Sequence, residues 1–291
     1  MTDKHGLIIK GVGGAYTVLA EGNRYVCNAR GVFRNTKTTP LIGDKVIIAV
    51  TSEEKKLGTL HTIKPRKNRL RRPPVSNLDQ VIITVATAQP SFNAGLLDRF
   101  LCLAEYENIS PLICVNKADV ANNEESFLPY INAGYPLVYT AATEYRGLDS
   151  LRAHMAGKIN VFAGPSGVGK SSLINALLPA LNLETGVLSA KLDRGKHTTR
   201  HSEIFMLGES EEEGFCVDTP GFTSLDIETI NKRELAGLFR EFVPLAMECR
   251  FADCLHNQEI DCAVKAAVGG AVSSVRYESY IKMLGGIING Q

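Results

Sequence analysis

The sequence predicts a multi-domain α/β protein with an N-terminal β-barrel, a central α/β domain and a helical C-terminal domain. Three observations lead to this fold class. Short apolar runs separated by turns fill about the first 65 residues, apolar strands and amphipathic helices alternate from Gln80 onward, and a cysteine-rich loop lies between two helical stretches near the end. We expect the domains to comprise residues 1–72, 73–226 and 227–291.

At 291 residues, the chain is long enough for these domains to bury cores of their own. It is 44% hydrophobic and 22% charged, which is ordinary for a globular protein in water. Its first residues lack a signal-peptide pattern, and its longest uncharged stretch, Gln80–Leu97, contains too many polar residues to span a membrane. We therefore expect a cytoplasmic monomer without a membrane partner.

The net charge of +1 conceals an uneven distribution along the chain. Residues 1–72 carry 15 Lys and Arg against 5 Asp and Glu, a net charge of +10, whereas residues 73–226 have a net charge of −8. A solvated basic face is the simplest explanation, but an imbalance of this size favours a polyanionic partner for the first segment.

Five candidate strands occupy the first segment, and glycine-containing turns separate several of them. They are Gly6–Val12, Ala15–Ala20, Tyr25–Ala29, Asp44–Ala49 and Thr59–Ile63. Five short strands with a longer connection between the third and the fourth predict a small barrel of the oligonucleotide-binding (OB) type. An SH3-like barrel would give nearly the same pattern.

A basic run separates this barrel from the central domain. Five of the seven residues from Arg66 to Arg72 are basic, and Pro73-Pro74 follows them. Two consecutive prolines cannot continue a helix or a central strand, so we place a domain boundary here. The run could be a solvated linker, but its position beside a basic barrel favours a phosphate-contacting edge.

The central segment alternates between apolar strands and amphipathic helices. Its predicted strands are Val81–Thr87, Leu112–Val115, Leu137–Thr140, Asn160–Ala163, Ser202–Leu207 and Gly214–Val217, the last two forming an antiparallel pair. Its predicted helices are Leu96–Glu107, Leu148–Met155 and Lys170–Leu178, and Asn231–Glu248 and Ser274–Met283 follow in the C-terminal segment. Ligands of open α/β sheets bind at the carboxyl ends of strands, so polar residues there are candidate site residues.

A phosphate-binding loop follows the predicted strand that ends at Ala163. The pattern Gly-x4-Gly-Lys-Ser between a strand and a helix is the P-loop signature, whose glycines let successive backbone N–H groups face phosphate oxygens. We expect Lys170 to reach the β- and γ-phosphates and assist catalysis, and the Ser171 hydroxyl to hold Mg²⁺. The loop residues expected to bind the nucleotide are Gly164, Pro165, Ser166, Gly167, Val168, Gly169, Lys170, Ser171 and Ser172.

The segment Asn116-Lys-Ala-Asp119 indicates that the base is guanine. The Asp119 carboxylate can accept from both the ring N–H and the exocyclic amino group, a pair of donors that adenine lacks. Asn116 would fix the loop and contact the base, while the Lys117 stem packs over the ring. Thr140-Ala-Ala142 resembles the next base-contacting element, where Ala142 contacts the guanine oxygen, although Thr140 replaces the usual Ser.

The order of these two motifs is unusual, because the guanine-reading motif lies 48 positions before the phosphate loop. In ordinary GTPases the phosphate loop comes first. One site can contain both motifs in this order only if the chain is circularly permuted. The sequence therefore predicts a circularly permuted P-loop GTPase domain whose substrate is GTP and whose product is GDP.

Two further segments complete the predicted site. Asp218 and Gly221 belong to an Asp-Thr-Pro-Gly motif after the last strand. Asp218 would support Mg²⁺ through water, and the Gly221 N–H would sense the γ-phosphate. Thr198 or Thr199, in the polar segment before that strand pair, would close on Mg²⁺ and the γ-phosphate.

The residue after this motif bears on catalysis. Phe222 stands where many GTPases carry the glutamine that orients the attacking water, so we expect slow intrinsic turnover. His197 is the candidate catalytic replacement, since imidazole can donate to or accept from water near pH 7. A histidine that touches RNA or is merely solvated is an equally simple interpretation.

A metal site is predicted by Cys249-x4-Cys254-x-His256-x5-Cys262, which places three thiols and one imidazole within 14 residues. Three cysteines and one histidine are a typical tetrahedral Zn²⁺ set, and four protein ligands leave no open position for catalysis. We therefore expect one structural Zn²⁺ that stabilises a small helical domain. The remaining cysteines lie in apolar segments and are expected to be buried thiols: Cys27, Cys102, Cys114 and Cys216.

The basic β-barrel, the permuted GTPase motifs and the Cys-x4-Cys-x-His-x5-Cys segment together resemble the bacterial small-ribosomal-subunit-dependent GTPase family, ribosome biogenesis GTPase A. The resemblance covers essentially the whole chain. It implies GTP hydrolysis stimulated by the small ribosomal subunit, a role in late maturation of that subunit with its rRNA as a partner, and a zinc-binding C-terminal domain. The histidine of the family's Gly-x-His-Thr-Thr segment matches His197, and the departures are Lys196 and Thr140.

Two other functions are compatible with the motifs. An RNA-binding assembly chaperone could use GTP only as a regulatory switch, and GTP turnover measured with and without small subunits separates it from a ribosome-stimulated enzyme. A permuted GTPase could also act on the large subunit, although the metal-binding segment and the basic barrel argue against this.

Overall fold

The computed structural model describes residues 2–29, 33, 38–70, 73–120, 124–181, 202–218 and 230–289. The chain divides into two compact units, each assembled from segments that are far apart in the sequence. The first unit comprises Met1–Ile82, Leu148–Phe162 and Ser171–Phe222. The second comprises Ile83–Gly147, Ala163–Lys170 and Thr223–Gln291.

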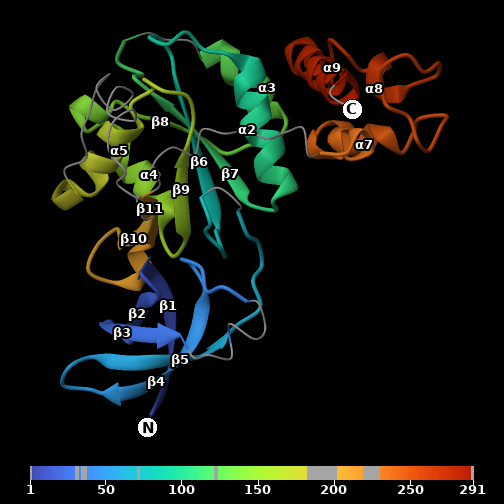
Figure 1. The fold of residues 1–291 in the computed structure, drawn as a ribbon. Coiled ribbons are helices and arrows are strands. Elements are labelled where there is room, and N and C mark those ends of the chain that lie inside the picture. The colour runs from blue at the N-terminus through green and yellow to red at the C-terminus, as the bar shows by residue number, and fades with distance from the viewer. Residues whose placement is uncertain are drawn as a thin grey trace. The chain divides into compact units, whose positions relative to one another are not determined.

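The first unit contains a closed five-stranded barrel, drawn at the blue end of the colour range in Figure 1. Its strands are β1 (Asp3–Val12), β2 (Ala15–Ala20), β3 (Asn23–Ala29), β4 (Lys45–Ser52) and β5 (Leu57–Ile63). They follow the order β2-β3-β5-β4-β1, and β1 pairs with β2 to close the barrel. The β3–β5 pair is parallel and the others are antiparallel, which confirms the OB-type barrel.

Apolar residues at alternate strand positions fill this barrel, because successive side chains of a strand point to opposite faces. The fully buried members include Ile8, Val18, Tyr25, Val46, Ile48 and Leu60. Strand β1 also pairs antiparallel with β10 (Glu203–Met206), and Lys10 lies opposite Glu203. Their side chains form an ion pair with 2.5 Å between Nζ and Oε2.

The rest of the first unit contains two parallel strands, which end at Ala163 and at Asp218. β10 pairs with β11 (Phe215–Asp218), which confirms the predicted antiparallel pair, and β11 runs parallel to β9 (Ile159–Ala163). The helices of this part are α4 (Leu148–Met155) and α5 (Lys170–Leu177). Both begin at the predicted residue, and α5 ends one residue earlier than predicted.

The second unit contains α/β elements whose strands end at the guanine-reading segment. β6 (Gln80–Ala86) contributes to both units and precedes β7 (Ser110–Asn116) and β8 (Leu137–Tyr139) in the strand order. β7 and β8 are parallel. Every β6 residue is buried, as in a parallel strand covered on both faces.

Helix α2 (Ala94–Tyr106) connects β6 to β7 and begins where its N-cap dictates. The Asn93 side chain accepts from the Leu96 N–H at 2.9 Å, which satisfies one of the free donors of the first turn. The short helix α3 (Leu128–Asn132) lies between β7 and β8 and was not predicted. Five residues are too few for a helical period to stand out in a sequence.

The C-terminal helices correct one prediction. Instead of a single helix over 231–248, the structure has α6 (Lys232–Leu235), a 3-10 turn (Ala236–Leu238) and α7 (Phe242–Ala246). Gly237 weakens the middle of this stretch, and Phe239 is extended with φ −100° and ψ 104°. Pro244 has no N–H to donate and is tolerated in the first turn of a helix, which is where α7 places it.

Two more helices complete the second unit and enclose an apolar core. They are α8 (Ala263–Ala266) and α9 (Ser274–Asn289), the latter continuing six residues beyond its predicted end. The buried core residues of this region include Leu235, Phe239, Phe242, Val264, Val272, Tyr280 and Leu284. No helix in the described ranges has the length and apolar character that crossing a bilayer requires.

Helix α9 is tied to α2 by a buried ionic cluster. The Arg276 guanidinium lies 2.5 Å from Asp98 Oδ1 on α2 and 2.9 Å from Glu241 Oε2 at the start of α7. Asp98 and Arg276 are almost completely buried, so each charge depends on the other for compensation.

Candidate functional site

Asn116 joins three loops of the second unit. Its Nδ2 donates to the Val168 carbonyl of the phosphate loop at 2.9 Å. Its Oδ1 accepts from the Thr140 hydroxyl at 3.1 Å and from the Ala142 N–H at 3.2 Å. The side chain is only 2% exposed, so these bonds form in a low-dielectric environment where each is strengthened. The guanine-reading motif and the phosphate loop are therefore neighbours in space.

Thr140 is buried and bonds to the guanine-reading motif through both its hydroxyl and its carbonyl. The Thr140 hydroxyl donates to Asn116, and the Thr140 backbone carbonyl accepts from the Ala118 N–H at 3.1 Å. Its extra methyl group is accommodated in a buried position. Thr140 thus links the loop after β8 to the guanine-reading motif.

Lys117 bridges two loops with its side chain. The Nζ donates to the Gly167 carbonyl at 2.8 Å and to the Gln89 carbonyl at 2.5 Å. The stem of the side chain is thus fixed beside the phosphate loop rather than free in solvent. The backbone of Lys117 is left-handed, with φ +60°, a conformation that non-glycine residues adopt only when their surroundings hold them.

Two glycines of the phosphate loop cannot carry a side chain. Gly164 has φ +132°, and an added Cβ would lie 2.1 Å from the Thr84 carbonyl oxygen. Gly169 has φ +94°, and its Cβ would lie 2.4 Å from Asn116 Nδ2. These positions show why the loop pattern requires glycine, since both the backbone angle and the close approach exclude a methyl group.

Lys170 begins helix α5 and points back over the loop. Its Nζ donates to the Gly164 and Pro165 carbonyls, both at 2.7 Å, and burial lowers its pKa. Ser171 and Ser172 follow it in the first turn and are half-buried, while Ser166 lies exposed in the loop. The ammonium and the turn of backbone that it spans form a positively polarised cradle suited to phosphate.

Of the remaining predicted nucleotide residues, the structure describes Asp119 and Asp218. Asp119 is exposed, and the described residues offer its carboxylate no hydrogen-bond partner. Asp218 ends β11, whose parallel neighbour β9 leads directly into the phosphate loop. The predicted residues His197, Thr198, Thr199 and Gly221, together with Lys196 and Phe222, lie outside the described residues.

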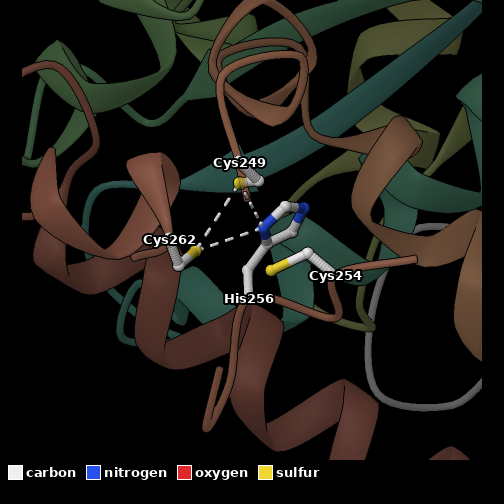
Figure 2. A group of neighbouring side chains, drawn as sticks. All are labelled: Cys249, Cys254, His256 and Cys262. Atoms are coloured by element: carbon white, nitrogen blue, oxygen red, sulfur yellow. Dashed lines mark hydrogen bonds between the residues drawn. The ribbon is translucent and has the colours of Figure 1, made fainter. Parts of the chain in front are cut away.

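A cluster near the C-terminus has four candidate ligand atoms within 4.8 Å of one another (Figure 2). Its members are Cys249, Cys254, His256 and Cys262. The Sγ atoms of Cys249 and Cys262 are 3.8 Å apart, and His256 Nδ1 lies 3.6 Å and 3.4 Å from them. A tetrahedral centre with bonds of about 2.0–2.3 Å separates its ligand atoms by about 3.5–3.8 Å. The cluster therefore has the dimensions of a four-coordinate metal site.

Burial favours the neutral forms of the cluster's side chains. Burial raises the pKa of the Cys254 thiol to about 12 and lowers the pKa of His256. The imidazole is thus held neutral, the form that binds metals, whereas buried thiolates need a nearby positive charge.

Side chains of α9 and of the loop itself hold the backbone of the loop that carries the cluster. Tyr277 on α9 donates to the His256 carbonyl at 2.8 Å, and Tyr280 donates to the Leu255 carbonyl at 2.5 Å. Glu259 accepts from the Leu255 N–H at 2.9 Å. His256 has φ +53°, and these bonds on either side of it keep the loop in that conformation.

The basic run after the barrel is partly neutralised within the chain. The Arg66 guanidinium pairs with the fully buried Asp44 at 2.6 Å, and Lys67 pairs with Asp79. Arg69 is exposed, and Arg71 and Arg72 lie outside the described residues. Arg66 and Lys67 therefore have a structural role that the charge pattern alone did not indicate.

Sequence reasoning also missed the loop between β6 and α2. Thr87 and Gln89 in this loop contact Lys117, yet neither belongs to a recognised motif. The available signal was their position just after the end of a fully buried strand of the α/β sheet, where ligands of such sheets bind.

Comparison with known proteins agrees with this site. The model of the RsgA GTPase family matches residues 63–228, and that of the RsgA N-terminal domain matches residues 5–59. The chain is 47% identical over 286 residues to the small ribosomal subunit biogenesis GTPase RsgA of Alkaliphilus metalliredigens, covering 97% of each protein. It is 44% identical to the protein of the same name from Clostridium novyi, covering 98% of each.

Two solved structures share the fold. One is YloQ, described as a circularly permuted GTPase, with a TM-score of 0.84, 36% identity and coverage of 100% of this chain and 96% of that one. The other is YjeQ from Thermotoga maritima, with a TM-score of 0.85, 34% identity and 99% coverage of both. Together with the family matches, they show that the chain belongs to the RsgA family of circularly permuted GTPases, the GTP hydrolases of small ribosomal subunit biogenesis.

Proposed function

We propose that the loops joined by Asn116 bind GTP and hydrolyse it when the small ribosomal subunit docks, during late maturation of that subunit. One observation carries this proposal. Asn116 and Lys117 of the guanine-reading motif contact Val168 and Gly167 of the phosphate loop, so a single ligand would touch both motifs. The sequence separation of 48 positions is thereby closed, as a permuted GTPase requires.

The base is read by the first of these loops. Asp119 accepts from the two guanine donors, Asn116 fixes the loop and contacts the base, and the Lys117 stem packs against the ring. Ala142 contacts the guanine oxygen. The exposed and unpaired state of the Asp119 carboxylate among the described residues supports this role. The phosphates lie against the backbone of residues 164–172, with Lys170 beside the β- and γ-phosphates.

Oxygen donors at the start of α5 and the end of β11 suit a magnesium ion. Ser171 and Asp218 offer the hydroxyl and carboxylate chemistry that Mg²⁺ prefers. When bound, the ion neutralises charge that develops on the phosphates. Thr198 or Thr199 and the Gly221 N–H close the site around the γ-phosphate.

Catalysis depends on a residue outside the common pattern. Phe222 has no polar group to orient water, so intrinsic turnover is slow, and His197 takes over that task when the small ribosomal subunit docks. This reading explains why a GTPase without the usual glutamine would need its target for activity.

The Cys3His cluster holds one structural Zn²⁺. Thiolate and imidazole ligands at these separations fit a closed tetrahedral site, in which no position is left for substrate. The chain then has three functional parts: the barrel and linker (1–72), the GTPase domain (73–226) and the zinc domain (227–291).

The barrel contacts rRNA of the small subunit. Exposed cations on it and on the linker include Arg24, Lys45, Lys55 and Arg69, and residues 1–72 have a net charge of +10. Contacts with phosphates release counterions, so binding weakens steeply as salt rises. The protein acts as a cytoplasmic monomer without a membrane partner.

The decisive experiment measures GTP hydrolysis with small subunits, large subunits or free RNA added in turn. Strong stimulation by small subunits alone, falling with salt, is expected. Equal stimulation by large subunits would contradict the choice of subunit. Turnover that stays slow under every condition, with GTP-dependent RNA binding, would favour an assembly chaperone that uses GTP as a switch.

A single substitution then tests the catalytic assignment. His197→Ala should remove most of the stimulated rate while GTP affinity and subunit binding stay close to the parent values, since a water-orienting group contributes mainly in the transition state. A variant that is stimulated as strongly as the parent would show that another group positions the water.

A further inference from the structure

The loop between β6 and α2 contacts the guanine-reading motif through Thr87. The Thr87 hydroxyl donates to the Lys117 carbonyl at 2.7 Å, and its backbone N–H donates to the Asn116 carbonyl at 3.3 Å. The side chain is 7% exposed, so water has little access to replace the hydroxyl bond. Thr87 thus holds consecutive carbonyl groups at the start of the motif.

These bonds act on a strained turn. Lys117 has φ +60°, a left-handed conformation that costs a non-glycine residue about 1 kcal/mol or more. Its carbonyl also accepts from the Val120 N–H at 3.0 Å, closing the turn that carries Asp119. Without the Thr87 hydroxyl, the peptide group after Lys117 would lose one of its two restraints and could rotate towards a relaxed conformation.

The side chain of Lys117 is held separately. Its ammonium group bonds to the Gln89 and Gly167 carbonyls, so its link to the phosphate loop does not depend on the Thr87 hydroxyl. The two kinds of contact therefore have separate roles. Thr87 fixes the backbone before Asp119, and Lys117 Nζ binds the phosphate loop.

We propose that Thr87 is a positioning residue for guanine selectivity, which holds the turn at residues 117–120 so that the Asp119 carboxylate faces both donors of the base. This inference rests on the proposed function of Asp119. It assigns a role in base recognition to a loop outside the GTPase motifs. Removing the hydroxyl should weaken base recognition and leave the phosphate contacts in place.

The test compares the affinities for GDP and for inosine diphosphate, whose base lacks the exocyclic amino group. Thr87→Val keeps the shape of the side chain but loses the donor. It should lower the preference for GDP over inosine diphosphate by about tenfold, which is the effect of losing the charge-assisted hydrogen bond between Asp119 and the exocyclic amino group. Thr87→Ser keeps the hydroxyl and should retain the parent preference. Ser91→Ala is the control, since Ser91 is an exposed residue of the same loop.

The outcomes separate this inference from the function on which it rests. Equal losses of affinity for the two nucleotides in Thr87→Val would overturn it and leave Thr87 as a packing residue. A parent protein with no preference for GDP would instead overturn the role of Asp119. If Thr87→Val fails to fold, Thr87→Ala supplies the same comparison, and in an Asp119→Ala background either variant should change the preference no further.

Discussion

The metal cluster and the nucleotide loops are assembled in opposite ways, although both contain segments of the second unit. All four cluster ligands lie between Cys249 and Cys262, and α9 supports the loop that carries them. The nucleotide loops come from segments around residues 87, 116, 140 and 167, which side-chain bonds of Thr87, Asn116 and Lys117 hold together.

This difference indicates how each region should fail. A local site with clustered thiols depends on a cation, because its ligands repel one another and are costly to ionise without one. A site built from distant loops depends on backbone geometry, because a shift in one loop breaks contacts with the others. Each region should therefore be breakable without the other.

The largest effect is expected from Cys254→Ser. The parent should contain about one zinc per chain, and the variant should lose it and unfold around the metal loop, since structural zinc sites contribute about 10 kcal/mol or more of folding free energy. Guanine nucleotide affinity should stay within a few-fold of the parent. Elemental analysis and nucleotide titration measure the two regions side by side.

A second thiol serves as the control for that experiment. Cys102 is buried on α2 and lies outside the cluster. Cys102→Ala should lower the free energy of unfolding by about 1–2 kcal/mol while keeping the metal. Full zinc content in Cys254→Ser would remove that residue from the site.

Gly169→Ala should break the nucleotide loops and spare the metal cluster. A Cβ would lie 2.4 Å from Asn116 Nδ2 at a backbone angle of φ +94°. Backbone strain and the displaced Asn116 bonds should together lower nucleotide affinity by about 100-fold or more. Gly134→Ala is a matched control, because Gly134 has φ +81° but open space around its Cβ position. Similar affinity losses in both variants would mean that a general loss of stability, and not the contact with Asn116, accounts for the effect.

Asp119→Asn should change specificity more than affinity. An amide presents a donor where the carboxylate accepts, so the variant should bind xanthosine nucleotides, whose ring carries a carbonyl in place of the amino group. The preference for GTP over XTP should fall by about 100-fold or more. Competition binding with both nucleotides measures this, and an unchanged preference would rule out Asp119 as the residue that reads the base.

The same contrast explains what could be predicted from the sequence. The strand Ala15–Ala20 and the helix Leu148–Met155 have the predicted bounds, because alternation, periodicity and glycine turns are local signals. The cluster of three cysteines and one histidine was predictable for the same reason, since its spacing is local. The helix predicted over 231–248 was wrong because Gly237 and Pro244 outweigh its apolar spacing.

The contacts that could not be predicted are the non-local ones. An OB barrel and an SH3-like barrel differ in strand pairing, and only the parallel β3–β5 contact distinguishes them here. Likewise, no period or motif indicates that Thr87 meets Lys117 or that Arg66 meets Asp44. Such pairs depend on where the fold brings distant segments together.

The smallest effect concerns the contact between α2, which follows the loop of Thr87, and α9, which supports the metal loop. There Asp98 on α2 meets Arg276 on α9. Burial raises the pKa of Asp98 to about 6, against the opposing effect of Arg276 and in the presence of Glu241. The folded state therefore holds this proton more tightly than the unfolded state, whose carboxyl has a pKa of about 3.9. Stability should fall by up to about 3 kcal/mol as the pH rises from about 4 to about 6.

Asp98→Asn removes this titration and keeps a hydrogen-bonding group beside Arg276. The variant should lose that part of the pH dependence, while its free energy of unfolding at pH 7 changes by about 1 kcal/mol or less, because the amide avoids the cost of a buried charge. Chemical denaturation at several pH values measures both. Glu105→Gln is the control on the same helix, because its partly exposed pair with Arg240 should contribute only about 0–1 kcal/mol. Unchanged zinc content and GDP affinity in Asp98→Asn would mean that the metal cluster and the nucleotide loops are energetically separate, whereas a change in either would place α2 as the connection between them.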